Sequence, residues 1–239
     1  MAMVNLRPAA IAALTLIVSA TVFADVPSRP ANPQELAVIR RVVTAVNTIF
    51  DRFVNSEWQQ RSASEHEEFS VATEPDRPIN FAMSSEREFE IRPGSALFNA
   101  KVKPVQDAAE AHDFAKLQAL SKQIDGATSF SVEADANVPG FEFAPSDLAH
   151  DLGAKGAAFS YCESGEELDC YVWFGDRTRW KSADGNMRKF SFAHPNGTPA
   201  VENLNIRFHA KSRTGMAADR IRELIRTTDW SAIAAAMTK

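Results

Sequence analysis

The spacing of apolar residues alternates between two periods along this chain, and the alternation limits the folds that it can adopt. Apolar residues three or four positions apart, which share one face of a helix, occur in four stretches: residues 33–60, 105–124, 215–226 and 229–237. Between these stretches apolar residues recur at every second position, as in strands that bury one face. Strands that alternate in this way favour antiparallel sheets with one solvated side. The sequence therefore predicts an α+β fold, a twisted antiparallel sheet with helices packed on one side.

The first helix has the strongest start signal. Asn32-Pro33-Gln34-Glu35 supplies an N-cap residue, a proline at the first helical position and a glutamate at the third. Because the following apolar residues form one stripe, we expect a helix to about Gln60 that packs against the sheet. The stripe consists of Leu36, Ile39, Val43, Val46, Phe50 and Phe53.

A second helix is expected over Val105–Ile124, where Phe114, Leu117 and Leu120 share a face and Asp125-Gly126 supplies the stop. Strands are expected around residues 69–71, 79–83, 89–91, 128–135, 157–162, 170–174, 187–193 and 204–210. We interpret residues 25–239 as a single domain, with a division into two α+β halves near residue 126 as the alternative.

The N-terminal segment predicts export. Arg7 is followed by an uncharged apolar stretch from Pro8 to Phe23, and Val22-Phe23-Ala24 has the small or aliphatic residues of a cleavage site. The apolar stretch is shorter than the roughly 20 residues that span a bilayer, which favours a cleaved signal peptide (residues 1–24) over an uncleaved anchor. No later segment is apolar enough to span a membrane. The mature chain is expected in the periplasm or outside the cell.

The only two cysteines are Cys162 and Cys170, and they flank a polar loop between two strand-like segments. Facing cysteines at the mouth of a hairpin should form a disulfide in an oxidising compartment. The alternative is a cell-envelope hydrolase with Cys170 as its nucleophile and His194 as its base, because Asp169–Trp173 resembles over a few residues the cysteine context of papain-like cell-wall peptidases. Those enzymes place the cysteine at a helix start, whereas strand-forming residues follow Cys170.

Composition and motifs exclude several other functions. A formal net charge of −5 argues against general nucleic-acid binding, and the 45% apolar content is that of a globular protein. No two of the five histidines are spaced as metal ligands on one element, and no phosphate loop or dinucleotide fingerprint occurs. The acidic cluster from Glu86 to Glu90 is typical of a solvated face. We therefore expect no metal, no cofactor and no catalytic centre.

The candidate binding residues are basic. In residues 204–211 the polar side chains Arg207, His209 and Lys211 share one face of a strand and the apolar ones share the other. If residues 187–193 pair beside this strand, Lys189 extends the row into a positive stripe, with Trp180 available for stacking. This pattern predicts a non-enzymatic domain that binds an anionic ligand or an envelope protein through its exposed sheet face.

The export interpretation makes a direct prediction: the mature chain begins at Asp25. Intact-mass analysis of protein isolated from the cell envelope should give the mass of residues 25–239. A mass that retains residues 1–24 would contradict cleavage at this site.

Overall fold

The computed structural model describes residues 28–64, 70–72, 86–121, 127–137, 142–143, 150–163, 165–182, 187–194 and 198–238. The predicted signal peptide and the strand expected at residues 79–83 lie outside these ranges. Within them, no helix is both long enough and apolar enough to cross a membrane.

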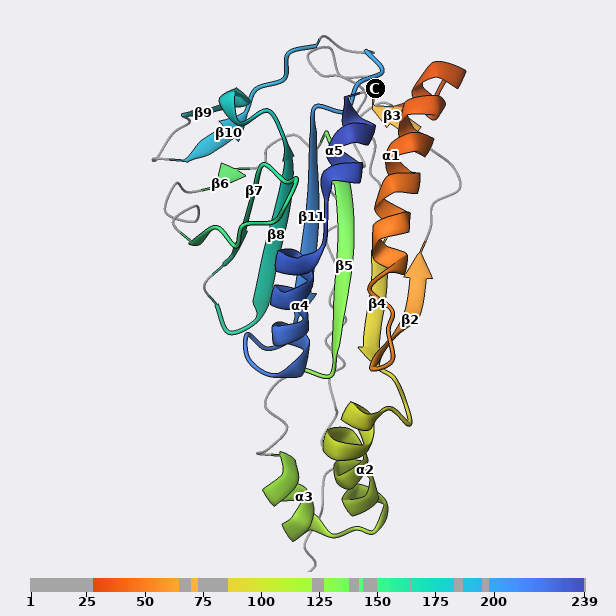
Figure 1. The fold of residues 1–239 in the computed structure, drawn as a ribbon, viewed down its shortest axis with the longest axis vertical. Helices are drawn as coiled ribbons and strands as arrows, with labels where there is room; N and C mark the ends of the chain where they lie inside the picture. The colour runs from red at the N-terminus through yellow and green to blue at the C-terminus, as the bar shows by residue number, and fades with distance from the viewer. Residues whose placement is uncertain are drawn as a thin grey trace, which may run out of the picture.

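The core of the protein is a six-stranded antiparallel sheet with the strand order β2-β4-β5-β11-β8-β7 (Figure 1). Its strands come from both sides of residue 126. In sheet order they are β2 (Trp58–Ser64), β4 (Glu86–Ile91), β5 (Ser129–Ala136), β11 (Asn203–Ala210), β8 (Leu168–Gly175) and β7 (Phe159–Cys162).

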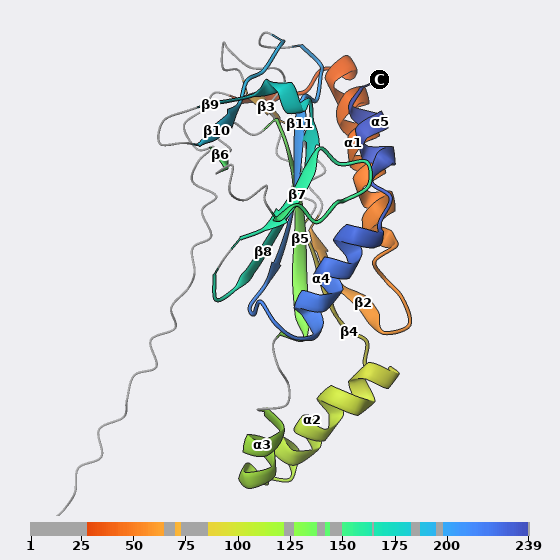
Figure 2. The same ribbon diagram turned by 60° about the vertical axis from the view of Figure 1, so that its left-hand side comes forward.

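Three helices cover one face of this sheet: α1 (Pro33–Asp51), α4 (Met216–Thr227) and α5 (Ser231–Met237) (Figure 2). Beneath them Phe53 contacts Phe208 of β11 and Trp230, which precedes α5, with ring centroids 5.8 Å and 6.1 Å away. All three side chains are essentially inaccessible to solvent. The predicted α+β fold, an antiparallel sheet with helices on one side, is thus confirmed.

The start of α1 follows the predicted capping box, but its end does not follow the prediction. The Asn32 side chain accepts hydrogen bonds from the Gln34 and Glu35 amides, and the Glu35 carboxylate accepts one from the Asn32 amide. The helix ends at Asp51, not near Gln60. The cause is Asn55, whose side-chain oxygen accepts the amides of Glu57 and Trp58, both at 2.8 Å, and so turns the chain into β2.

The prediction of a single helix over Val105–Ile124 is also wrong. The structure instead has a pair of helices in this region, α2 (Lys103–Glu110) and α3 (Phe114–Ser121), and the pair projects beyond one end of the sheet (Figure 1). The helix is interrupted because His112 adopts a φ of 54° and the Asp113 side chain accepts the Lys116 amide as a new N-cap. Phe114, which we expected to share one helix face with Leu117 and Leu120, is 74% exposed.

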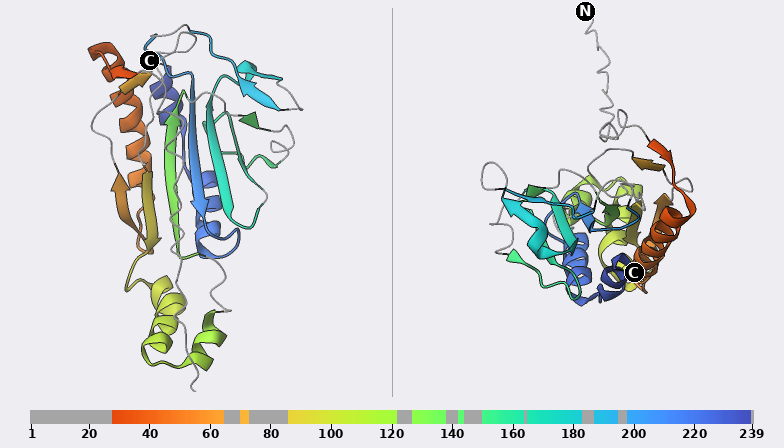
Figure 3. Two further views of the ribbon diagram at one scale, coloured as in Figure 1. Left: turned by 180° about the vertical axis from the view of Figure 1, so that it is seen from behind. Right: turned by 90° about the horizontal axis from the view of Figure 1, so that it is seen from above.

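The sheet face opposite the helices carries a small three-stranded sheet at one corner (Figure 3). Its strands are β6 (Glu142–Phe143), β10 (Arg188–Phe190) and β9 (Trp180–Ser182). Between the two sheets lies a second apolar cluster, formed by Phe143, Phe159, Tyr161, Trp173, Trp180 and Phe190. A separate pair of short strands, β1 (Ser28–Pro30) and β3 (Ser70–Ala72), lies beside the start of α1.

The two cysteines face each other across β7 and β8 and form a disulfide, which confirms the predicted bond. Cys170 is fully buried in the main core. The bond closes the hairpin at its loop end, because the two residues are eight positions apart in sequence.

Removing the disulfide should destabilise the fold without changing it. The double variant Cys162→Ala/Cys170→Ala should lose about 2–3 kcal/mol of unfolding free energy, because the short loop is no longer closed in the unfolded chain. Urea denaturation measures this, and a reductant should lower the stability of the wild type only. Alkylation of native, unreduced protein at Cys170 would contradict the bond.

Candidate functional site on the open face of the sheet

Side chains of β11 alternate between the two faces of the sheet as predicted. Leu204, Ile206 and Phe208 are fully buried in the core beneath the helices. Arg207 and His209 therefore lie on the opposite face, and both are partly exposed. This open face, to which β11 and its neighbours contribute every second residue, is the candidate functional surface.

Arg207 is held by carboxylates from both neighbouring strands. Its guanidinium lies 2.7 Å from Asp169 of β8 and 3.1 Å from Glu133 of β5. Burial alone would lower the pKa of Arg207, but the hydrogen bond to Asp169 and the charge of that carboxylate raise it above its usual value. Arg207 is therefore charged but neutralised, and it does not offer a free positive charge to an anionic ligand.

The remaining predicted residues do not form a single positive stripe. His209 shares Asp169 with Arg207, through an Nδ1–Oδ1 distance of 3.2 Å, and Lys211 lies exposed just beyond the end of β11. Lys189 is not beside them, because β10 pairs with β6 and β9 whereas β11 pairs with β5 and β8.

Trp180 is not available for stacking on a ligand. It is 7% exposed, and its ring packs edge-on against Trp173 at 5.1 Å and Phe143 at 4.8 Å within the second apolar cluster. A tryptophan beside basic residues suggested a binding surface in the sequence. Part of the cover over Trp180 comes from Phe143 of β6, a two-residue strand that no local sequence pattern indicates.

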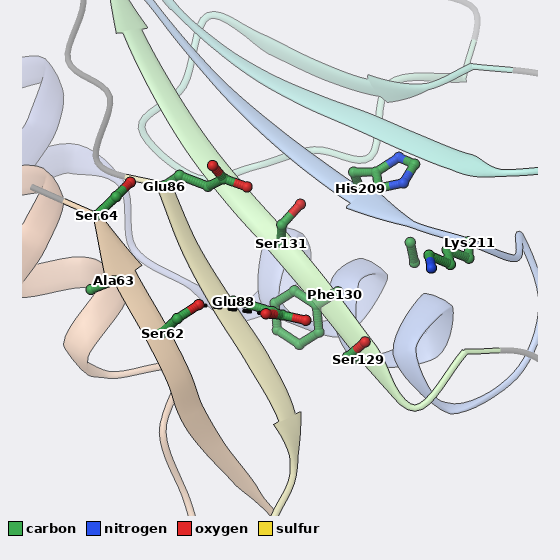
Figure 4. Close-up of a pocket in the computed structure, with 11 residues that line it drawn as sticks. Ser62, Ala63, Ser64, Glu86, Glu88, Ser129, Phe130, Ser131, His209 and Lys211 are labelled. Atoms are coloured by element: carbon green, nitrogen blue, oxygen red, sulfur yellow. Dashed lines mark hydrogen bonds between the residues drawn. The ribbon is translucent and has the colours of Figure 1, made fainter. Parts of the chain in front are cut away.

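A pocket of about 390 Å³ lies on the open face, across β2, β4, β5 and β11 (Figure 4). This volume falls within the range of small-molecule sites. In Figure 4, Glu86 and Glu88 lie on one side, His209 and Lys211 on the other, and Ser131 between them. The polar lining residues are Ser62, Ser64, Glu86, Glu88, Ser129, Ser131, His209 and Lys211.

The two sides of this pocket differ in charge. Glu88 contacts Arg61 at 3.0 Å, but both side chains keep substantial exposure, and Glu86 is exposed. Lys211 and the His209 imidazole face these carboxylates across the serine side chains of β5. A ligand that carries both a positive and a negative group would match this arrangement. The alternation of side chains along β4 and β5 could have placed Glu88 and Ser131 on the open face. Only the order of the strands in the sheet brings these residues near His209.

An unusual carboxyl group lies farther along the same face. Burial, followed by the nearby charge of Glu133, raises the pKa of Asp135 to about 7, while Arg207 acts in the opposite direction. Asn205 is the cross-strand neighbour of Asp135 and is 2% exposed. Within the described part of the chain, its side-chain oxygen accepts no hydrogen bond. A protonated Asp135 has an O–H group, which is a hydrogen-bond donor of the type that could pair with this oxygen.

Cys170 cannot act as a nucleophile in this structure, because it is buried and bonded to Cys162. His194, the other residue of the hydrolase alternative, has its Nδ1 atom 2.9 Å from the Glu202 carboxylate. Cys170 therefore has a structural role, because its disulfide joins β8 to β7. Among the described residues, no group of three or more potential ligands is placed to hold a metal ion.

The raised pKa of Asp135 predicts a pH-dependent stability. Because the folded protein retains a proton up to about pH 7 that the unfolded chain releases near pH 4, the contribution of Asp135 to stability falls as the pH rises between these values. Asp135→Asn should therefore stabilise the protein at pH 8 more than at pH 5, as measured by urea denaturation. The surface variant Asp107→Asn is the control. An equal effect of Asp135→Asn at both pH values would contradict the raised pKa.

Neither a protein-family model nor a curated protein nor a solved structure matches this chain. The functional proposal therefore depends on the geometry of its surface.

Proposed function

We propose that this protein is an exported, non-enzymatic binding domain that engages an envelope protein or another envelope component through the open face of its sheet. The observation that carries the proposal is the pocket across β2, β4, β5 and β11, with carboxylates on one side and Lys211 and His209 on the other. Polar side chains from four strands line this one pocket. They are not part of the main core, which lies on the helix-covered face of the sheet.

The charges of this face favour a ligand of mixed charge over a purely anionic one. Arg207 is already neutralised by Asp169 and Glu133, and His209 also contacts Asp169, so Lys211 is the main group that remains to receive an anionic group. Glu86 and Glu88 can receive a cationic group on the other side of the pocket. Exposed polar segments of a protein carry both kinds of group, which makes an envelope protein the favoured partner.

Two features support export to an oxidising compartment. The first is the apolar segment after Arg7, with its small-residue exit at Ala24. The second is the Cys162–Cys170 disulfide, since such bonds persist mainly in oxidising environments. The same bond disfavours the hydrolase alternative, because it occupies the cysteine that would attack a substrate.

The proposal predicts that binding depends on the charges of the pocket. The variant Glu88→Gln/Lys211→Gln removes one charge of each sign from it and should reduce recovery of the bound partner from an envelope extract of the producing organism. The matched control, Lys103→Gln/Asp107→Asn, removes the same two charges from an exposed pair on α2 that is distant in sequence from the pocket strands.

Thermal stability should change little in either variant, because exposed ion pairs contribute only about 0–1 kcal/mol. Recovery should also fall as salt rises, since exposed charges are screened over roughly 8–10 Å. If the pocket variant and the control recover every component equally, the open face is a solvated surface and not the binding site.

A further inference from the structure

A second pocket, of about 680 Å³, lies at the other end of β11 from the open-face pocket. The open-face pocket adjoins His209 and Lys211, whereas the second pocket adjoins Val201 and Glu202, just before β11 begins. Its walls come from the end of α5, the end of β8 and the turn Arg177–Arg179, and Arg41 of α1 completes it. It is therefore a separate site that uses none of the open-face residues.

Two half-buried arginines line this pocket and retain free donors. Among the described residues, the Arg179 side chain makes no hydrogen bond or ion pair, although it is partly buried. Arg41 donates its Nε–H to the Ala236 carbonyl at 2.8 Å, which fixes the guanidinium at the last turn of α5. Its terminal nitrogens make no hydrogen bond within the described part of the chain. Planar guanidinium groups of this kind match carboxylate, sulfonate and phosphate groups.

The carboxylates of the pocket already have donors. Asp176 accepts hydrogen bonds from the Thr178 amide and hydroxyl, both at 2.8 Å. Glu202 accepts the amides of Ala193 and His194, at 2.6 and 2.8 Å, and contacts the His194 imidazole. The two Thr178 hydrogen bonds, and after them the charge of Arg179, lower the pKa of Asp176, but neither carboxylate is hydrogen-bonded to Arg41 or Arg179. The terminal nitrogens of both arginines therefore remain open to a ligand.

The rest of the lining is largely apolar. Phe190, Val201 and Met237 contribute side chains that are 7%, 4% and 9% exposed. A ligand that fills the pocket would therefore remove apolar surface from water as well as pair with the arginines. Inorganic anions would use only the charged part of the site.

We propose that this pocket binds a small organic anion, with its acidic group at Arg41 and Arg179 and an apolar body against Phe190, Val201 and Met237. The site is independent of the open face. The protein would therefore bind a small molecule in this pocket in addition to the macromolecular partner proposed for the open face.

The fluorescent probe 8-anilinonaphthalene-1-sulfonate, which has a sulfonate and an apolar ring system, tests the proposal on the full-length mature protein. It should bind saturably with one probe per chain. Arg179→Gln should weaken binding about tenfold or more, because hydrogen bonds to charged groups contribute strongly where they are partly shielded from water. Arg177→Gln is the matched control, since Arg177 lies on the same turn but its side chain is 67% exposed and does not line the pocket.

The uncharged analogue N-phenyl-1-naphthylamine separates the roles of charge and shape. Its affinity should be the same in the wild type and in Arg179→Gln, and Lys211→Gln on the open face should change neither probe's affinity. If circular dichroism shows that Arg179→Gln does not fold, Arg41→Gln replaces it with the same expected loss. Equal affinity of the sulfonate probe for the Arg179→Gln and Arg177→Gln variants, or no saturable binding to the wild type, would overturn the proposal.

Discussion

The packing of Phe53, Phe208 and Trp230 is the interaction on which the rest of the structure depends. These rings bring together the chain after α1, the central strand β11 and the start of α5. Phe208 can reach the other two only if the even-numbered residues of β11 point toward the helices. Because side chains alternate along a strand, this contact also determines that Arg207 and His209 point away from them. One apolar contact thus defines both the core and the open face.

Away from the corner that the second apolar cluster covers, the opposite face is organised by charge. Arg207 joins β5 and β8 through Glu133 and Asp169, and His209 shares the second of these carboxylates. The basic residues near the middle of the sheet are therefore used to balance the acidic side chains of the neighbouring strands. Basic groups that remain for a ligand lie toward the two ends of β11, at Lys211 on the open face and at Arg41 and Arg179 in the second pocket.

Local patterns in the sequence were sufficient to predict the features that depend on neighbouring residues. The capping box at Asn32, the alternation of β11 and the Cys162–Cys170 hairpin are of this kind, because each involves residues close together in the chain. The end of α1 was misplaced because Phe53 continues the helical apolar spacing but enters the core from the segment after the helix. Apolar periodicity cannot distinguish these two cases.

The candidate sites were harder to predict, because they depend on which distant strands become neighbours. Asp169 and Glu133 flank Arg207 from positions 38 and 74 residues away in sequence. Similarly, the assumption that Lys189 lies beside β11 failed because β8 occupies that position in the sheet. Long-range pairing of this kind leaves no local signal, so a basic strand looks like a positive surface until its acidic neighbours are known.

Carboxyl labelling of the native protein tests most directly whether the helices cover one face and leave the other open. Carbodiimide coupling of glycinamide, mapped by mass spectrometry, reports the accessibility of each carboxylate in solution. Glu88 and Glu133 on the open face, with side chains 33% and 40% exposed, should be labelled, whereas Glu35 at the start of α1, 1% exposed, should be protected. Protection of Glu88 and Glu133 to the same degree as Glu35 would contradict an open sheet face.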